Sequence, residues 1–103
     1  MTDKPKAHKQ FMEEFPAIAK GYEAVATAVH DAGPLDEKNR QLVKLALAIG
    51  ARHEGAVHAH TRRALEAGLT PEEIKQVAAL AVTTLGMPNA VAAYTWINDI
   101  LAK

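Results

Sequence analysis

Three of the five histidines in the chain fall within ten residues, "ARHEGAVHAH", which are numbered 51 to 60. They are His53, His58 and His60, and Glu54 follows the first of them. An imidazole changes its charge near neutral pH and is also a common metal ligand. This segment could therefore carry out acid–base chemistry or hold a metal ion.

Helical spacing separates these side chains into two groups, because each residue of an α-helix turns by about 100°. His53 and His60 are seven residues apart and share one face. Glu54 and His58 are four apart on a neighbouring face, and Arg62 continues that line. His58 and His60 point to nearly opposite sides. One helix therefore cannot bring all three imidazoles to one ion.

The pattern does not favour a native metal site. Glu54 and His58 could supply two ligands, but a third would have to come from elsewhere in the protein. The H-E-x-x-H signature is absent, because Val57 stands where its second histidine would be. The simpler interpretation is an i,i+4 pair on a partly exposed helix. We expect no metal and no other cofactor, and we keep a His/Glu metal-binding protein as an alternative.

Composition narrows the class of protein. The chain has 103 residues, of which 49% are apolar and 23% charged, as expected for one globular domain over residues 1–103. The formal net charge is zero, so no overall basic field favours nucleic acid. The absence of cysteine excludes disulfides, thiolate catalysis and zinc–thiolate sites. The polar start "MTDKPKAHKQ" and the lack of a long apolar run predict a cytoplasmic protein without a membrane partner.

Helical patterns run through the whole chain, and no alternating strand pattern interrupts them. The expected helix boundaries are Pro16, Gly33-Pro34, a cap at Asp36, a start near His53, Gly68, a capping box from Thr70 to Glu73, and Gly86-Met87-Pro88. The fold class is therefore predicted to be an all-α bundle. The segments "AALAVTTLG" and "NAVAAYTWI" are apolar on more than one face, which predicts a homo-oligomer in which the last helix contributes to the contacts.

The order of these segments from "LDEKNRQLVKLALAIGARHEGAVHAH" onward resembles the carboxymuconolactone decarboxylase family, which includes the alkylhydroperoxidase D-like proteins. The resemblance covers about residues 9–101 and is most specific over "HAHTRRALEAGLTPEEI". It implies the compact helical bundle of that family, assembled as a trimer or hexamer.

In the redox branch of the family, a Glu precedes a Cys-x-x-Cys motif and a final His. The resemblance places the Glu position at Gln41, the cysteine positions at His53 and Ala56, and the final His at His60. Only the final His is retained. Since His and Ala cannot replace a thiolate, no thiol peroxidase activity is expected.

The decarboxylase branch needs neither cysteine nor cofactor, and the resemblance places its His at His60 and an Arg at Arg62. Loss of CO₂ leaves an enolate-like charge, which an imidazole can protonate and a guanidinium can stabilise. The predicted catalytic residues are His60, His53 and Gln41. The predicted substrate-binding residues are Arg62, Arg52, His58 and Glu54.

The first functional hypothesis is thus a cofactor-independent lyase or isomerase acting on a small carboxylated or carbonyl compound. The alternatives are a non-catalytic oligomeric binding or structural protein, and a metal-dependent or cysteine-independent redox protein. For the first hypothesis we expect His60 and Gln41 to be buried near one another, with His53 at the mouth of the pocket. His58 should pair with Glu54 or meet a neighbouring subunit.

Overall fold

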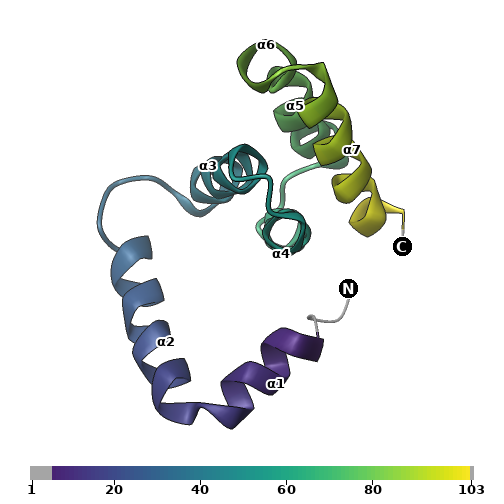
Figure 1. Cartoon of the computed structure of the whole chain (residues 1–103). Helices are drawn as coiled ribbons and strands as arrows, with labels where there is room; N and C mark the ends of the chain where they lie inside the picture. Colours follow the sequence, from purple (N-terminus) through teal and green to yellow (C-terminus); the bar gives the residue numbers. More distant parts are fainter. Residues whose placement is uncertain (1–5, 103) are drawn as a thin grey trace. The chain divides into compact units, whose positions relative to one another are not determined.

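The computed structural model describes residues 6–102, and every regular element within them is an α-helix (Figure 1). The helices are α1 (Lys6–Glu14), α2 (Pro16–His30), α3 (Glu37–Gly50), α4 (Glu54–Glu66), α5 (Pro71–Leu80), α6 (Val82–Leu85) and α7 (Met87–Leu101). The predicted all-α fold is confirmed. Among these helices none has the length and apolar character needed to cross a membrane.

The contacts of the described residues divide them into two compact units, one up to residue 35 and the other from residue 36 onward. The first holds α1 and α2, and the second holds α3 to α7. The single domain over residues 1–103 stays a prediction. All of the predicted site residues belong to the second unit.

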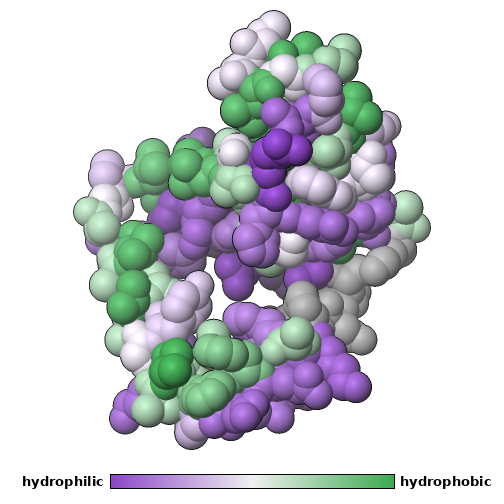
Figure 2. All heavy atoms as spheres, in the orientation of Figure 1, coloured by the Kyte–Doolittle hydropathy of each residue, from purple (hydrophilic) through white to green (hydrophobic). Residues whose placement is uncertain are grey.

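The first unit is a helical pair joined at a proline. Pro16 occupies the first turn of α2, where its missing N–H costs no hydrogen bond, as the sequence predicts. The rings of Phe11 and Phe15 pack across the junction with centroids 5.0 Å apart. Neither helix contains a buried residue. Along α2 the exposed apolar side chains recur at helical spacing, namely Ile18, Tyr22, Val25 and Val29. Figure 2 shows hydrophobic atoms on the surface of this unit.

Polar caps fix where two helices of the second unit begin. The Asp36 carboxylate accepts the backbone N–H of Asn39 at the start of α3. At the start of α5, the Thr70 hydroxyl accepts the Glu73 N–H and the Glu73 carboxylate accepts the Thr70 N–H, which completes the predicted capping box. The hydrogen bond from the Thr70 backbone N–H to the Glu73 carboxylate lowers the pKa of Glu73. Both caps were expected, because each depends on residues close in sequence.

One helix boundary was not predicted. The sequence suggests one helix from Pro71 to the glycine at position 86, but the structure divides it at Ala81 into α5 and α6. The Ala81 N–H bonds to the Ala78 carbonyl, which is the tighter spacing of a 3₁₀ turn. Three β-branched residues then follow, and these have a weaker helical preference than alanine. Gly86 adopts φ 96° and ψ 155°, a conformation available almost only to glycine, and it separates α6 from α7.

Helix α4 has neighbours on two sides, since it packs against both α3 and α7. Helix α5 also packs along α7. The fully buried side chains at these contacts are largely aliphatic: Leu45, Val57, Ala64, Ile74, Ala93 and Ile97. Their burial supplies the main stabilisation of the unit, because removal of apolar surface from water drives folding. The core therefore fixes the orientation of α4, with one side of this helix toward α3 and another toward α7.

Candidate functional site

The junction between α3 and α4 is a tight turn centred on Arg52. Its N–H bonds to the Ile49 carbonyl, and the next N–H, from His53, bonds to the Ala48 carbonyl. These two hydrogen bonds define a Schellman ending for α3. Arg52 has φ 56°, in the left-handed region where glycine is usual. The backbone of Arg52 thus ends α3. Its side chain is exposed, and its role in substrate binding stays a prediction.

His53 begins α4. Its Nδ1 accepts the backbone N–H of Ala56 at 3.0 Å, so the imidazole serves as the N-cap. The ring lies over Gly55, where an added Cβ would come within 3.3 Å of the His53 Cε1. A nitrogen that accepts this hydrogen bond carries no proton, so the proton of the neutral ring is on Nε2. The sequence predicted His53 as a catalytic residue at the mouth of a pocket, and the structure gives its ring a capping role that was not anticipated.

The buried stripe of α4 contains Val57, Thr61 and Ala64. His58 and His60 lie on opposite sides of this stripe, about 200° apart at the usual helical rotation. The His58 edge faces α7, because His58 contacts a residue of that helix. The His60 edge is on the other side of α4. The predicted site residues therefore do not form one cluster, and the two edges are described separately.

On α3, Gln41 is only 2% exposed, which confirms its predicted burial. Its Nε2 donates to the Glu37 carboxylate at 3.3 Å. Since a carboxylate only accepts, this contact fixes the amide orientation and leaves Oε1 facing inward. Within residues 6–102 that buried oxygen has no hydrogen-bond partner. His60 is partly buried and its Nδ1 is enclosed, while the closeness of His60 to Gln41 stays a prediction.

Basic side chains that the sequence reasoning did not single out gather near Gln41. Burial lowers the pKa of Lys44, and the neighbouring Arg63 of α4 lowers it further. Arg40 acts on Lys44 in the same direction and also forms an ion pair with Glu37 at 2.6 Å. The sequence pattern that could have revealed part of this cluster is the 3/4 spacing of residues 37, 40, 41 and 44, which places them on one face of α3. We call the region formed by Glu37, Arg40, Gln41, Lys44 and Arg63 the α3–α4 seam, and we include in it His60, which lies one helical turn before Arg63 on α4.

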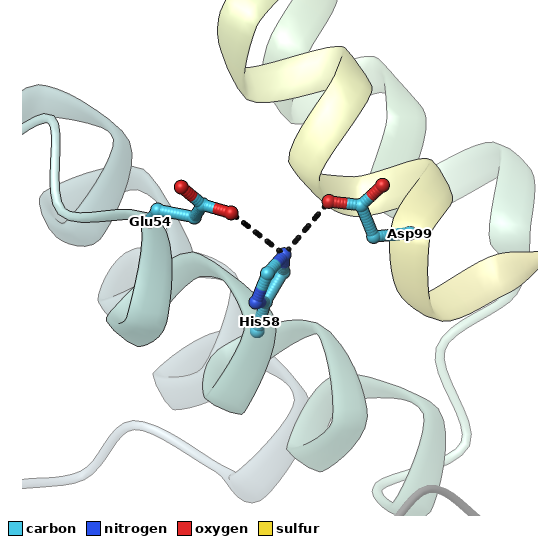
Figure 3. Close-up of side chains that lie close together, drawn as sticks. All are labelled: Glu54, His58 and Asp99. Atoms are coloured by element: carbon cyan, nitrogen blue, oxygen red, sulfur yellow. Dashed lines mark hydrogen bonds and ion pairs between the residues drawn. The ribbon is translucent and has the colours of Figure 1, made fainter. Parts of the chain in front are cut away.

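The other edge of α4 carries a second cluster (Figure 3). His58 Nε2 lies 3.8 Å from a Glu54 carboxylate oxygen and 3.0 Å from Oδ2 of Asp99 on α7. The pairing of His58 with Glu54 within one chain is confirmed. Asp99 was missed, because it is 41 residues away and nothing in the local pattern connects it with His58. We call these three residues the α4–α7 triad.

Arg62 follows the triad by one turn of α4. It is only 8% exposed and makes no hydrogen bond or ion pair to the other residues between 6 and 102. It lies about 200° from His60 on the helix, so it cannot reach the same side of α4. Lys44 and Arg63 are instead the cations on the His60 edge. This separation of Arg62 from His60 follows from the sequence alone, and the role of Arg62 in substrate binding stays a prediction.

An open, mostly apolar groove of about 610 Å³ lies along α5 and α7. Met87, Val91 and Tyr94 of α7 line it and are exposed, with Ala79 and Val82 on the facing side. No residue of the seam or of the triad contributes to it. The groove is thus distinct from the candidate polar sites.

The chain matches a known protein family over most of its length. The model of the carboxymuconolactone decarboxylase family matches residues 16–99, which includes the seam and the triad. The chain belongs to this family. Its sequence contains no cysteine, so it lacks the residues that carry out the thiol chemistry of the redox branch.

Two relatives of this family member are themselves uncharacterized proteins. One, from Methanocaldococcus jannaschii, is 37% identical over 82 residues, which are 77% of each chain. The other, from Haemophilus influenzae, is 32% identical over 59 residues, which are 57% of this chain and 52% of that protein. No solved structure matched. The names of these relatives give no activity, so the chemistry of this chain is inferred from its own site.

Proposed function

We propose that this family member catalyses cofactor-independent acid–base chemistry, a decarboxylation or an isomerisation, on a small carboxylated or carbonyl compound. The reaction takes place in the α3–α4 seam, with His60 as the acid–base group. In a decarboxylation, the bond to the carboxyl carbon breaks, CO₂ leaves and its electron pair stays on the substrate as an enolate. Protonated His60 then donates its proton to carbon, and solvent restores the imidazolium.

The buried Oε1 of Gln41 is the observation that carries this proposal. A buried carbonyl oxygen without a hydrogen bond costs about 1–3 kcal/mol. Proteins rarely keep such a group unless it has a role. The Gln41 oxygen can accept a hydrogen bond from a substrate hydroxyl or from an imidazole N–H. It lies on α3, which packs against the helix that carries His60.

Charge in the seam suits an anionic substrate. Arg40, Lys44 and Arg63 supply three cationic side chains, against the single carboxylate of Glu37. Besides burial, repulsion from Arg63 and Arg40 lowers the pKa of Lys44, and a bound carboxylate would relieve that repulsion. The same cations would stabilise an enolate as it forms, because fixed charges act strongly where water is partly excluded.

A thermal-stability screen with small carboxylates tests the substrate class. A carboxylate that binds the folded chain should stabilise it by about 2.7 kcal/mol at 100 times its Kd. Lys44→Met should abolish most of this stabilisation, whereas Lys20→Met on exposed α2 should leave it unchanged. Stabilisation that is equal in the Lys44→Met variant and in the unmodified protein would contradict the proposed site.

The proposal includes assembly as a homo-oligomer, a trimer or hexamer. The apolar groove along α5 and α7 supports it, because exposed apolar side chains of this kind commonly mark contact surfaces. Light scattering at micromolar concentration should give a mass of three or six copies of the 11.1-kDa chain. Val91→Asp in the groove should reduce this mass, while Glu23→Asp on α2 should not. A monomer mass for the unmodified protein would refute the assembly.

A further inference from the structure

We propose that the α4–α7 triad is a binding site for one divalent transition-metal cation. Its ligands would be the Nε2 of His58 and one carboxylate oxygen each from Glu54 and Asp99. This site lies on the opposite edge of α4 from His60. It is independent of the acid–base chemistry proposed for the seam.

The positions of the three ligand atoms fit an ion. All three lie within 4.8 Å of one another, with His58 Nε2 at 3.0 Å from Asp99 and 3.8 Å from Glu54. Zinc bonds of about 2.0–2.1 Å in a tetrahedral site place ligand atoms about 3.3 Å apart. Small side-chain rotations would therefore bring the three atoms to bonding distance. Figure 3 shows the two carboxylates on either side of the imidazole nitrogen.

Hydrogen bonding alone does not satisfy this arrangement well. The Nε2 of an imidazole carries at most one hydrogen, which can point directly at only one of the two carboxylates. Two carboxylates so close together also repel one another. A divalent cation would neutralise both charges and bind all three ligand atoms at once. The triad is therefore better matched to a metal ion than to a simple ion pair.

The core holds the supporting helices in place. Val57 precedes His58 on α4, and Ile100 follows Asp99 on α7, and both are buried. The ligand side chains themselves remain accessible, with exposures of 57% for Glu54, 23% for His58 and 45% for Asp99. Three protein ligands at an accessible position would leave coordination sites open to water or to a small molecule, as in catalytic zinc sites.

The chemistry of the ligands narrows the choice of metal ion. One imidazole nitrogen with two carboxylate oxygens suits Zn²⁺, Fe²⁺ or Mn²⁺. The imidazole makes an all-oxygen cation such as Ca²⁺ a poorer match, and the lack of sulfur disfavours Cu⁺. We choose Zn²⁺ as the probe, because it has no redox chemistry and no strong geometric preference.

Calorimetric titration of chelator-treated full-length protein with Zn²⁺ tests the site. We expect one Zn²⁺ bound per chain. Glu54→Gln and Asp99→Asn should each weaken the affinity about tenfold or more, because each removes a ligand charge while keeping the side-chain shape. Circular dichroism without metal will show that both variants keep their helices.

Two controls separate this site from other histidines. His8→Gln removes an exposed imidazole of α1, and His60→Ala removes the proposed acid–base group of the seam. Both should retain the Zn²⁺ affinity of the unmodified protein. The site is refuted if Zn²⁺ does not bind saturably, or if both carboxylate variants bind it as tightly as the unmodified protein. It is equally refuted if His8→Gln or His60→Ala loses the bound ion. Loss of activity in His60→Ala with Zn²⁺ binding intact would show that the two proposals stand separately.

Discussion

Replacing His60 with alanine is expected to lower kcat/KM for a carboxylate substrate by about 10²-fold or more, the usual scale for losing a general acid–base group. The imidazole is the proton carrier of the proposed reaction, because histidine is the side chain best suited to proton transfer near neutral pH. Steady-state kinetics on a substrate found by the ligand screen would measure the loss. The KM should change less than kcat, because the cations that hold the carboxylate remain.

His30→Ala is a suitable comparison for this experiment, since it removes a histidine of α2, which belongs to the first unit and not to the proposed site. Its kcat/KM should stay within a factor of about two of the original value, which is well below the loss expected at an acid–base residue. Full activity in the His60→Ala protein would exclude His60 as the proton carrier. Such a result would leave the metal site untouched.

Replacing Ile97 with alanine is expected to lower the free energy of unfolding by about 2–5 kcal/mol. Ile97 is fully buried on α7, two residues before Asp99, and packs in the core of the second unit. Its truncation would remove apolar contacts and leave a cavity. Urea unfolding followed by circular dichroism would measure the difference.

Val91→Ala on the same helix provides the matched control. Val91 is 53% exposed, so its truncation should cost about 0.5 kcal/mol or less in the folded monomer. Equal losses for Ile97→Ala and Val91→Ala would contradict the description of the core. A larger loss at Val91 that depends on protein concentration would instead reveal an intersubunit contact.

Features of the fold that depend on neighbouring residues were predictable. The Asp36 cap, the box formed by Thr70 and Glu73, and the proline start of α2 each arise within four residues of sequence. The pairing of Glu54 with His58 follows from i,i+4 spacing in the same way. Helical patterns along the chain predicted the all-α class, and the family resemblance added the type of bundle.

Features that depend on tertiary packing were not predictable from these signals. Asp99 reaches His58 only because α7 packs along α4, and no periodic pattern encodes that register. The capping role of His53 was also not predictable, since its position in the sequence gives no sign that Nδ1 would accept a backbone N–H. Lys44 and Arg63 likewise come together from different helices. The separation of Arg62 from His60, in contrast, follows from helical spacing alone.

The capping role of His53 has a stereochemical consequence. Because its Nδ1 is used to begin α4, protonating that nitrogen would break the cap, so His60 would be the single proton carrier in the proposed reaction. An isomerase with one such base removes and returns hydrogen on the same face of the substrate. Part of a hydrogen-isotope label at the reacting carbon should then be retained in the product. A pair of bases on opposite faces would instead exchange that label with solvent and invert the carbon.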